Sequence, residues 1–188
     1  MKWNYFNTTI TAVMLITLPF KAMGEHCNAS EWNKLLKLQT ELDQTYNLHA
    51  QKFNQFLQVH NEQPFLYQEF TAQEIRQFWA SNKSTLHQSM NSQIEASLFV
   101  VNRIQAERVT LQNLEVSATK QQQLWQTISL HCSEVGVRSN TIASQNYAQL
   151  NQALTLDIKK LFTKLLILEQ RYTKEVDALR QAKSEPEN

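Results

Sequence analysis

Glycine and proline are scarce in this sequence, whose 188 residues include only two glycines and three prolines. Tight β-hairpins, phosphate-binding loops and nucleophile elbows need glycine where the backbone takes a positive φ or approaches a ligand closely. Gly24 and Gly136 are the whole supply, and they lie far apart in the chain. The scarcity therefore argues against Rossmann, P-loop, β-barrel and β-sandwich folds.

Charged residues are few and nearly balanced, with 18 Lys and Arg against 17 Asp and Glu. A net charge of +1 gives no basic footprint for nucleic acid, so we expect no nucleic-acid partner. Charged residues make up 19% of the chain, below the share of about 25% in a typical domain. Because interface cores are depleted of charge, this composition favours a protein that contacts other proteins.

The sequence lacks the common catalytic and metal-binding motifs. Its two cysteines do not form a C-x-x-C pair, and its five histidines form neither H-x-x-x-H nor H-E-x-x-H. The serines stand in no nucleophile motif, and no pair of carboxylates is placed as acid and base. We therefore predict a protein that is not an enzyme and uses no cofactor.

The first 24 residues have the layout of a secretory signal peptide. Lys2 supplies positive charge, an apolar run follows through residues 10–18, and Ala22-Met23-Gly24 offers small residues at the −3 and −1 positions. We expect cleavage between Gly24 and Glu25 and export to the periplasm or beyond it. The run is shorter than the roughly 20 residues of a membrane span, so we expect no stable span after cleavage. Retention of this segment as an anchor is the alternative.

Cys27 and Cys132 are the only cysteines, and both remain in the exported chain. An even count in an oxidising compartment predicts a disulfide between them. Closing a loop of about 100 residues stabilises a fold by up to roughly 4–5 kcal/mol in the chain-entropy model. Each cysteine follows a histidine, so His26 and His131 would lie near the bond, and a Cys2His2 zinc site is the rival interpretation. Adjacent His-Cys pairs lack the usual zinc spacing, so we expect the disulfide and no metal.

A first long helix is predicted to begin near Glu31, with Asn28 or Ser30 as its N-cap. We expect it to end at residues 61–63, because Pro64 disfavours the helical state of the residue before it.

This helix carries the seam of a coiled coil. Positions 32, 35, 39, 42, 46, 49, 53, 56 and 60 follow alternating steps of three and four residues, which average 3.5. Three of these positions hold polar residues, Gln39, His49 and His60. Polar seam residues often set register or partner number, so these three are our candidate partner contacts.

Thr71 and Glu74 have the spacing of a capping box, which predicts a short helix through Trp79. Residues 81–84 predict a turn. A helical pattern then runs from Leu86 to Val135 without glycine or proline, although its polar stretch at residues 117–120 is where a break would fall.

Gly136 is expected to end the long pattern, and Ser139 or Asn140 to cap the last helix. The apolar positions of that helix, from Leu150 to Leu179, recur at about 3.6 residues, the period of an amphipathic helix. Residues 184–188 are polar and predict a disordered tail.

These elements predict an all-α fold, an elongated antiparallel three-helix bundle with coiled-coil-like packing that forms one domain over residues 25–183. Its arms would be residues 31–80 with a kink at Pro64, residues 84–135 and residues 140–183, each roughly 65–75 Å long. The start of the first arm and the end of the second then meet, which lets the disulfide close. A break near Ser117 would give a four-helix bundle, the alternative.

The functional expectation is a non-catalytic exported protein that acts through a protein partner or self-association. It would serve as an adaptor or assembly subunit of a bacterial envelope machine. A periplasmic holdase chaperone is the alternative, because long helices leave apolar faces available to unfolded clients. A metal or small-ligand sensor that uses His26 and His131 is the third hypothesis.

Overall fold

The computed structural model describes residues 27–60 and 62–185, and the regular structure in that part of the chain is helical. Five helices follow one another: α1 (Ala29–His60), α2 (Leu66–Glu69), α3 (Ala72–Ala80), α4 (Ser84–Glu134) and α5 (Arg138–Ser184). The prediction of an all-α helical bundle is confirmed. The expected signal peptide, His26 and residues 186–188 of the expected tail lie outside the described residues.

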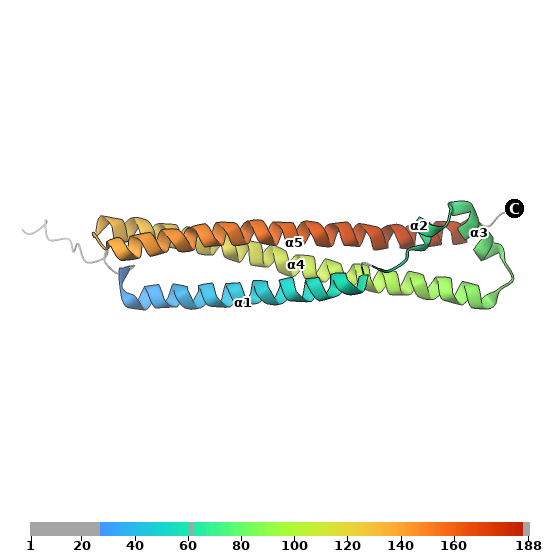
Figure 1. Cartoon of the computed structure of the whole chain (residues 1–188), viewed down its shortest axis with the longest axis horizontal. Coiled ribbons are helices and arrows are strands. Elements are labelled where there is room, and N and C mark those ends of the chain that lie inside the picture. Colours follow the sequence, from blue (N-terminus) through green and yellow to red (C-terminus); the bar gives the residue numbers. More distant parts are fainter. Residues whose placement is uncertain (1–26, 61, 186–188) are drawn as a thin grey trace, which may run out of the picture.

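α4 and α5 form an antiparallel hairpin along the length of the bundle, and α1 lies along the half that contains the α4–α5 turn (Figure 1). α2 and α3 lie at the opposite end, against the C-terminal part of α5. α4 continues unbroken through residues 117–120, so the four-helix alternative is wrong. At 1.5 Å per residue, the 51 residues of α4 span about 76 Å.

Residues 31–80 do not form a single kinked arm, contrary to the prediction. α1 ends at His60, four residues before the proline, and a non-helical segment leads to the single turn of α2. Phe65 at the end of that segment is extended, with φ −109° and ψ 128°, and its side chain is fully buried. Burial of this ring directs the chain onto α5 instead of along the axis of α1.

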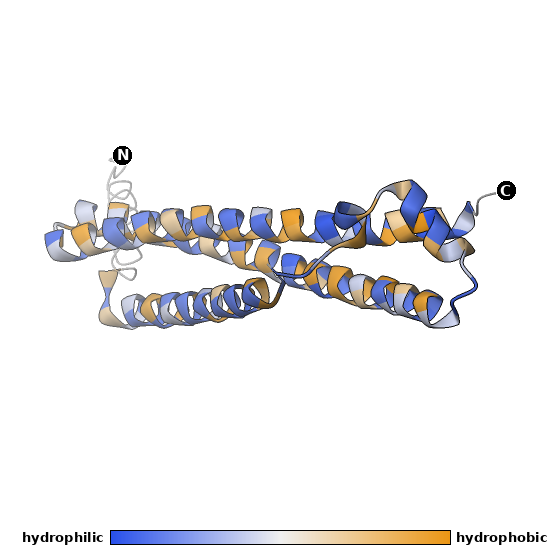
Figure 2. Cartoon of the chain, turned by 45° about the vertical axis from the view of Figure 1, so that its right-hand side comes forward, coloured by the Kyte–Doolittle hydropathy of each residue, from blue (hydrophilic) through white to orange (hydrophobic). Residues whose placement is uncertain are grey.

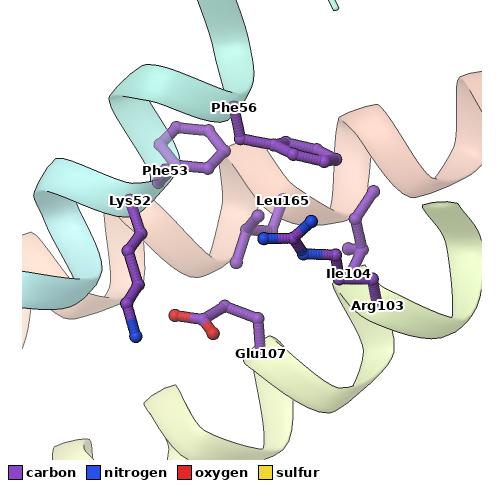
Figure 3. A pocket seen from close by; sticks show the side chains of 7 residues that line it. All are labelled: Lys52, Phe53, Phe56, Arg103, Ile104, Glu107 and Leu165. Atoms are coloured by element: carbon purple, nitrogen blue, oxygen red, sulfur yellow. The ribbon is translucent and has the colours of Figure 1, made fainter.

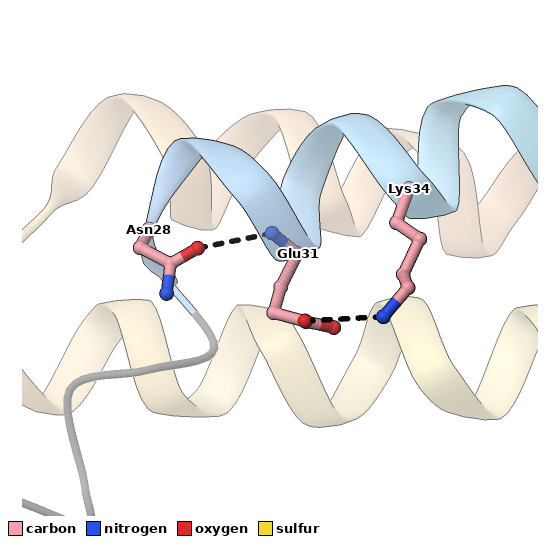
Figure 4. Close-up of polar contacts among 3 residues, drawn as sticks. All are labelled: Asn28, Glu31 and Lys34. Atoms are coloured by element: carbon pink, nitrogen blue, oxygen red, sulfur yellow. Dashed lines mark hydrogen bonds and ion pairs between the residues drawn. The ribbon is translucent and has the colours of Figure 1, made fainter.

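The starts of α1 and α3 follow the sequence signals. Asn28 Oδ1 accepts the backbone N–H of Glu31 at 2.9 Å, so Asn28 caps α1 (Figure 4). The Glu31 carboxylate then accepts a bond from Lys34 at 3.3 Å on the exposed side of the first turn. The predicted capping box at α3 is present: Thr71 N–H donates to the Glu74 carboxylate at 2.8 Å, and Glu74 N–H donates to Thr71 Oγ1 at 3.2 Å.

The predicted cap of the last helix at Ser139 or Asn140 is wrong, because α5 already begins at Arg138 and has no side-chain cap bond. The reason is the way in which α4 ends. Gly136 has φ +77°, Gly136 N–H donates to Ser133 O at 3.2 Å and Val137 N–H donates to Cys132 O at 2.8 Å. This Schellman pair of bonds turns the chain directly into α5, which leaves no room for a separate cap.

The core is a string of three clusters along the bundle rather than one compact centre. The disulfide end packs around Trp125, which is fully buried, the middle holds Phe53 and Tyr172, and the α3 end packs around Ile75 and Leu179. Figure 2 shows that apolar and polar residues alternate along the long helices, as expected for the 3.5-residue seam. Apolar residues therefore also reach the outer faces of the bundle.

Candidate functional site

A groove lies between α1 and α4 in the middle of the bundle, and we call it the α1–α4 groove. Its inner part has a volume of about 50 Å³. Lys52, Phe53 and Phe56 line it from α1, and Arg103, Ile104, Glu107 and Leu165 line it from α4 and α5 (Figure 3). The Arg103 guanidinium lies 5.8 Å from the centre of the Phe56 ring, a cation–π contact that orients this charge along the groove.

The groove widens toward the end of α1 into an outer part of about 350 Å³. Lys52, Phe56 and Arg103 line this part as well, together with Gln55, Val59, His60, Phe99 and Val100. The side chains of Val59 and Phe99 are each 68% exposed. This part of the groove thus combines two cations with apolar side chains, and no carboxylate of the described residues lines it.

His49 and His60, two of the predicted partner contacts, lie beside this groove. The His49 ring hydrogen-bonds to the Glu107 carboxylate at the acidic side of the inner groove. His60 Nδ1 contacts the Tyr172 hydroxyl. Burial and the nearby Arg103 lower the pKa of His60 below its usual 6.5, and burial raises the pKa of Tyr172 to about 12.

The contact between His60 and Tyr172 joins α1 to α5. At neutral pH His60 is uncharged and Tyr172 keeps its proton, so the two side chains share one hydrogen bond whose donor depends on which ring nitrogen of His60 carries the proton. The centres of the two rings are 5.3 Å apart, and the ring planes are nearly perpendicular. The contact holds the last turn of α1 on the bundle at the open end of the groove.

Gln39, the third predicted partner contact, is 4% exposed and lies in a polar network inside the disulfide half of the bundle. Its side-chain oxygen accepts the indole N–H of Trp125 at 3.1 Å and the amide N–H of Asn151 at 2.6 Å. Gln121 adds a bond from its amide to Leu35 O at 3.0 Å. These residues fix the register of α1 against α4 and α5, and the partner-contact role of Gln39, His49 and His60 stays a prediction.

The disulfide between Cys27 and Cys132 is present, with a Cα–Cα distance of 5.6 Å. It ties the start of α1 to the end of α4, beside an edge-to-face pair of Trp32 and Trp125 whose ring centres are 5.0 Å apart. His131 lies in the same last turn of α4, 3.9 Å from the Glu134 carboxylate. Within residues 27–60 and 62–185, no cluster of three or more His, Cys, Asp or Glu side chains is placed to hold a metal ion.

Glu175 is the main polar residue that sequence analysis missed. Its side chain is fully buried, and its two carboxylate oxygens accept the backbone N–H groups of Leu66 at 3.0 Å and Tyr67 at 3.1 Å. Gln93 Nε2 adds a third bond at 3.2 Å. The carboxylate therefore satisfies the first N–H groups of α2 and anchors that turn on α5. The sequence signal was an acidic residue three positions after Tyr172, on the apolar stripe of α5.

A second groove lies between α4 and α5 in the disulfide half, and we call it the glutamine groove. It has a volume of about 620 Å³. The residues that line it are all uncharged: Gln122, Gln126, Ser129 and Leu130 of α4, and Gln145, Ala148, Gln149 and Gln152 of α5. The sequence alone does not indicate this groove, because it forms only when the two helices pair.

None of the helices in the described part of the chain combines the length and apolarity needed to cross a membrane. Comparison with protein-family models, curated proteins and solved structures finds no match for this chain. The two grooves are therefore interpreted from their own residues.

Proposed function

We propose that this protein is a non-catalytic exported helical protein that acts through protein–protein contacts, as an adaptor or assembly subunit of a bacterial envelope machine. The α1–α4 groove is its contact surface in this proposal. The observation that carries it is the exposure of Val59 and Phe99 on either side of a groove that also holds Lys52 and Arg103.

This groove suits a partner segment that has an apolar side chain next to a carboxylate. Burying a Val or Phe side chain against a partner contributes roughly 1.5–3 kcal/mol each. Arg103 lies over Phe56, so its planar group is already oriented to receive a carboxylate in two hydrogen bonds. Glu107 would repel such a partner less because it is engaged by His49.

Export to the periplasm or beyond it is part of the same proposal. Disulfides persist in oxidising compartments, and the bond between Cys27 and Cys132 supports such a location. Cleavage between Gly24 and Glu25 would leave Cys27 as the third residue of the mature chain, directly before α1.

Position-specific photo-crosslinking in the native host tests the contact surface. A benzophenone amino acid replaces Val59 or Phe99 in the groove, and in a matched control it replaces Ile167 of α5, which is 55% exposed. We expect a discrete adduct from the two groove positions and none from the control. The adduct should disappear when Lys52→Glu and Arg103→Glu are added. Adducts at all three positions, or adducts insensitive to the charge reversal, would contradict an adaptor that binds through this groove.

A holdase chaperone is the second candidate function, and the number of exposed apolar side chains favours it. Large apolar residues at least 36% exposed occur on all three long helices and include Leu38, Leu48, Phe99, Val116, Leu130, Leu156 and Ile167. A holdase should suppress aggregation of an unfolded outer-membrane protein in a light-scattering assay, whereas an adaptor should not.

The sensor hypothesis depends on His26, which lies outside the described residues, and it predicts that zinc raises the melting temperature of the oxidised protein.

A further inference from the structure

α1 is the least buried of the three long helices, all of which the structure describes in full. Four of its 32 residues are buried, against 13 of 51 in α4 and 12 of 47 in α5. Three of the four lie in the disulfide half of α1, and Phe53 is the buried residue of the half that forms the α1–α4 groove. The groove half of α1 is therefore held by one buried side chain and by the polar contacts of His49 and His60.

Open space lies along both edges of α1. The α1–α4 groove follows one edge, and a hollow of about 320 Å³ follows the other, between Tyr46 and Asn54 of α1 and Lys160 and Lys164 of α5. By contrast, α4 and α5 pack on each other along the bundle (Figure 1). A segment with few buried apolar contacts can open locally while the rest of a protein stays folded. α1 has these properties.

The chain is fixed at both ends of α1. At its start, the disulfide joins Cys27 to Cys132 of α4. Beyond its end, Phe65 is fully buried, and the Glu175 carboxylate accepts the N–H of Leu66 at 3.0 Å, which anchors the following turn on α5. Cys27 and Phe65 are 38 positions apart, so an open α1 in the oxidised protein would remain a loop closed at both ends.

The disulfide opposes this opening, because a closed loop has less conformational entropy than a chain with a free end. For a loop of about 40 residues, the chain-entropy model makes the opening of α1 about 100 to 1,000 times less favourable in the oxidised protein than in the reduced one. The α3 end of the bundle has its own core cluster on α3, α4 and α5 and lies outside this loop. Reduction should therefore act on α1 far more than on the α3 end.

We propose that α1 is a strap that the Cys27–Cys132 disulfide holds closed, so that the redox state of this bond controls whether the α1–α4 groove is complete. Lys52 and Phe56 belong to the α1 wall of that groove, and both leave it when α1 opens. This inference rests on the proposed function, in which the groove is the contact surface, and it adds a regulation of the same surface. The oxidised chain presents the groove, and the reduced chain loses it.

The reductant in this proposal is a protein dithiol. Cys132 is fully buried whereas Cys27 is partly exposed, so the attacking thiolate reaches Cys27. Its sulfur bonds to Cys27 Sγ, the bond between the two Sγ atoms breaks, and Cys132 leaves as a thiolate that takes up a proton. The second thiolate of the reductant then attacks the first reductant sulfur and releases Cys27, which is also protonated. Two electrons and two protons pass to the protein, and the reductant leaves as a disulfide.

Amide hydrogen exchange of the mature chain, residues 25–188, tests the strap. The oxidised wild type is compared with the same protein kept reduced by dithiothreitol. We expect the amides of Leu42 and Phe53 to exchange about 100 to 1,000 times faster after reduction. The amides of Ile94 and Val176, in the core cluster of the α3 end, should change by less than about threefold.

The variant Cys27→Ser with Cys132→Ser is the matched control, because it lacks the bond and keeps side chains of similar size. Its α1 amides should exchange fast with or without dithiothreitol. Equal acceleration in α1, α4 and α5 would overturn the strap, because the three helices would then open as one unit. Unchanged exchange of α1 after reduction would overturn it as well. The reduced wild type carries the test if the variant folds poorly.

Photo-crosslinking through Val59 then tests the control of the groove. The discrete adduct of the oxidised chain should fall at least about fivefold in the variant without the disulfide, since only the closed form presents the groove. An adduct of unchanged yield in a variant whose α1 exchanges fast would overturn the redox control. Absence of any adduct from the oxidised chain would reject the proposed adaptor function alone, because the exchange experiment uses no partner and still decides whether α1 is a strap.

Discussion

Replacement of Glu175 by glutamine should destabilise the end of the bundle that contains α2 and α3. Glu175 accepts two adjacent backbone N–H groups, those of Leu66 and Tyr67, on its two carboxylate oxygens. A glutamine of the same shape has one oxygen and one NH2 group, so one backbone N–H would face another donor. A buried donor without a partner costs about 1–3 kcal/mol.

We therefore expect Glu175→Gln to lower the free energy of unfolding by about 2 kcal/mol, because one donor of the pair loses its acceptor. Glu175→Ala removes every acceptor and leaves a cavity, so about 4 kcal/mol is expected. A change of 1 kcal/mol shifts the melting temperature of a chain of this size by about 2–4 °C. The two variants should thus melt about 4–8 °C and about 8–16 °C below the wild type.

Circular dichroism at 222 nm follows the melting, and amide hydrogen exchange of Leu66 and Tyr67 follows the local contact. Both amides should exchange faster in Glu175→Gln than in the wild type. Asp177→Asn is the matched control, because Asp177 is an exposed carboxylate on the same helix, where surface changes stay within about 0.5 kcal/mol. If Glu175→Gln and Asp177→Asn have the same melting temperature, and the Leu66 and Tyr67 amides keep their protection from exchange, the buried carboxylate does not anchor α2.

Three further changes test other parts of the bundle. Replacing Cys27 and Cys132 by serine should lower stability by up to roughly 4–5 kcal/mol, because the bond closes a loop with a sequence separation of 105 residues; unchanged urea midpoints of the variant and the oxidised wild type would contradict this. Stability should fall as pH drops below about 6.5, because the unfolded chain protonates His60 where the folded site, with its lowered pKa, resists the proton. In a plot of urea midpoint against pH, His60→Gln should remove this fall below pH 6.5. A variant whose midpoint falls in parallel with that of the wild type would contradict a role for His60 in the pH dependence. Gln39→Leu should cost about 2–3 kcal/mol by leaving two buried donors without their acceptor, and a melting temperature equal to that of the wild type would show that the network is not stabilising.

The ends of most helices could be predicted from the sequence because the signals for them act locally. Asn28, Thr71 with Glu74, Pro64 and Gly136 each control the backbone within a few residues, and the structure has helix boundaries next to all of them. The predicted cap at Ser139 or Asn140 was wrong because another local feature of the backbone determines the start of α5. The Schellman turn at Gly136 fixes where α5 begins, and its two bonds were not visible as a motif in the sequence.

The polar contacts between helices could not be predicted, because they join residues far apart in the chain. Glu175 and Leu66 are separated by 109 residues, and His60 and Tyr172 by 112. The seam marked His60 as facing inward, but a period of 3.5 residues does not specify which residue of another helix lies opposite. The sequence did not predict Lys52 and Arg103 as groove residues for a related reason. They flank the seam and become neighbours only when α1 packs on α4.

The unbroken length of α4 sets the spacing between the two grooves. Arg103 of the α1–α4 groove and Gln126 of the glutamine groove are 23 positions apart on one continuous helix, which corresponds to about 35 Å along its axis. α4 is uninterrupted and pairs with α5 over this stretch, so molecules attached at the two places would keep a nearly constant separation. Inserting one heptad into both α4 and α5 between these places would increase that separation by about 10 Å while preserving the seam. Helix length would then set the distance between the two places.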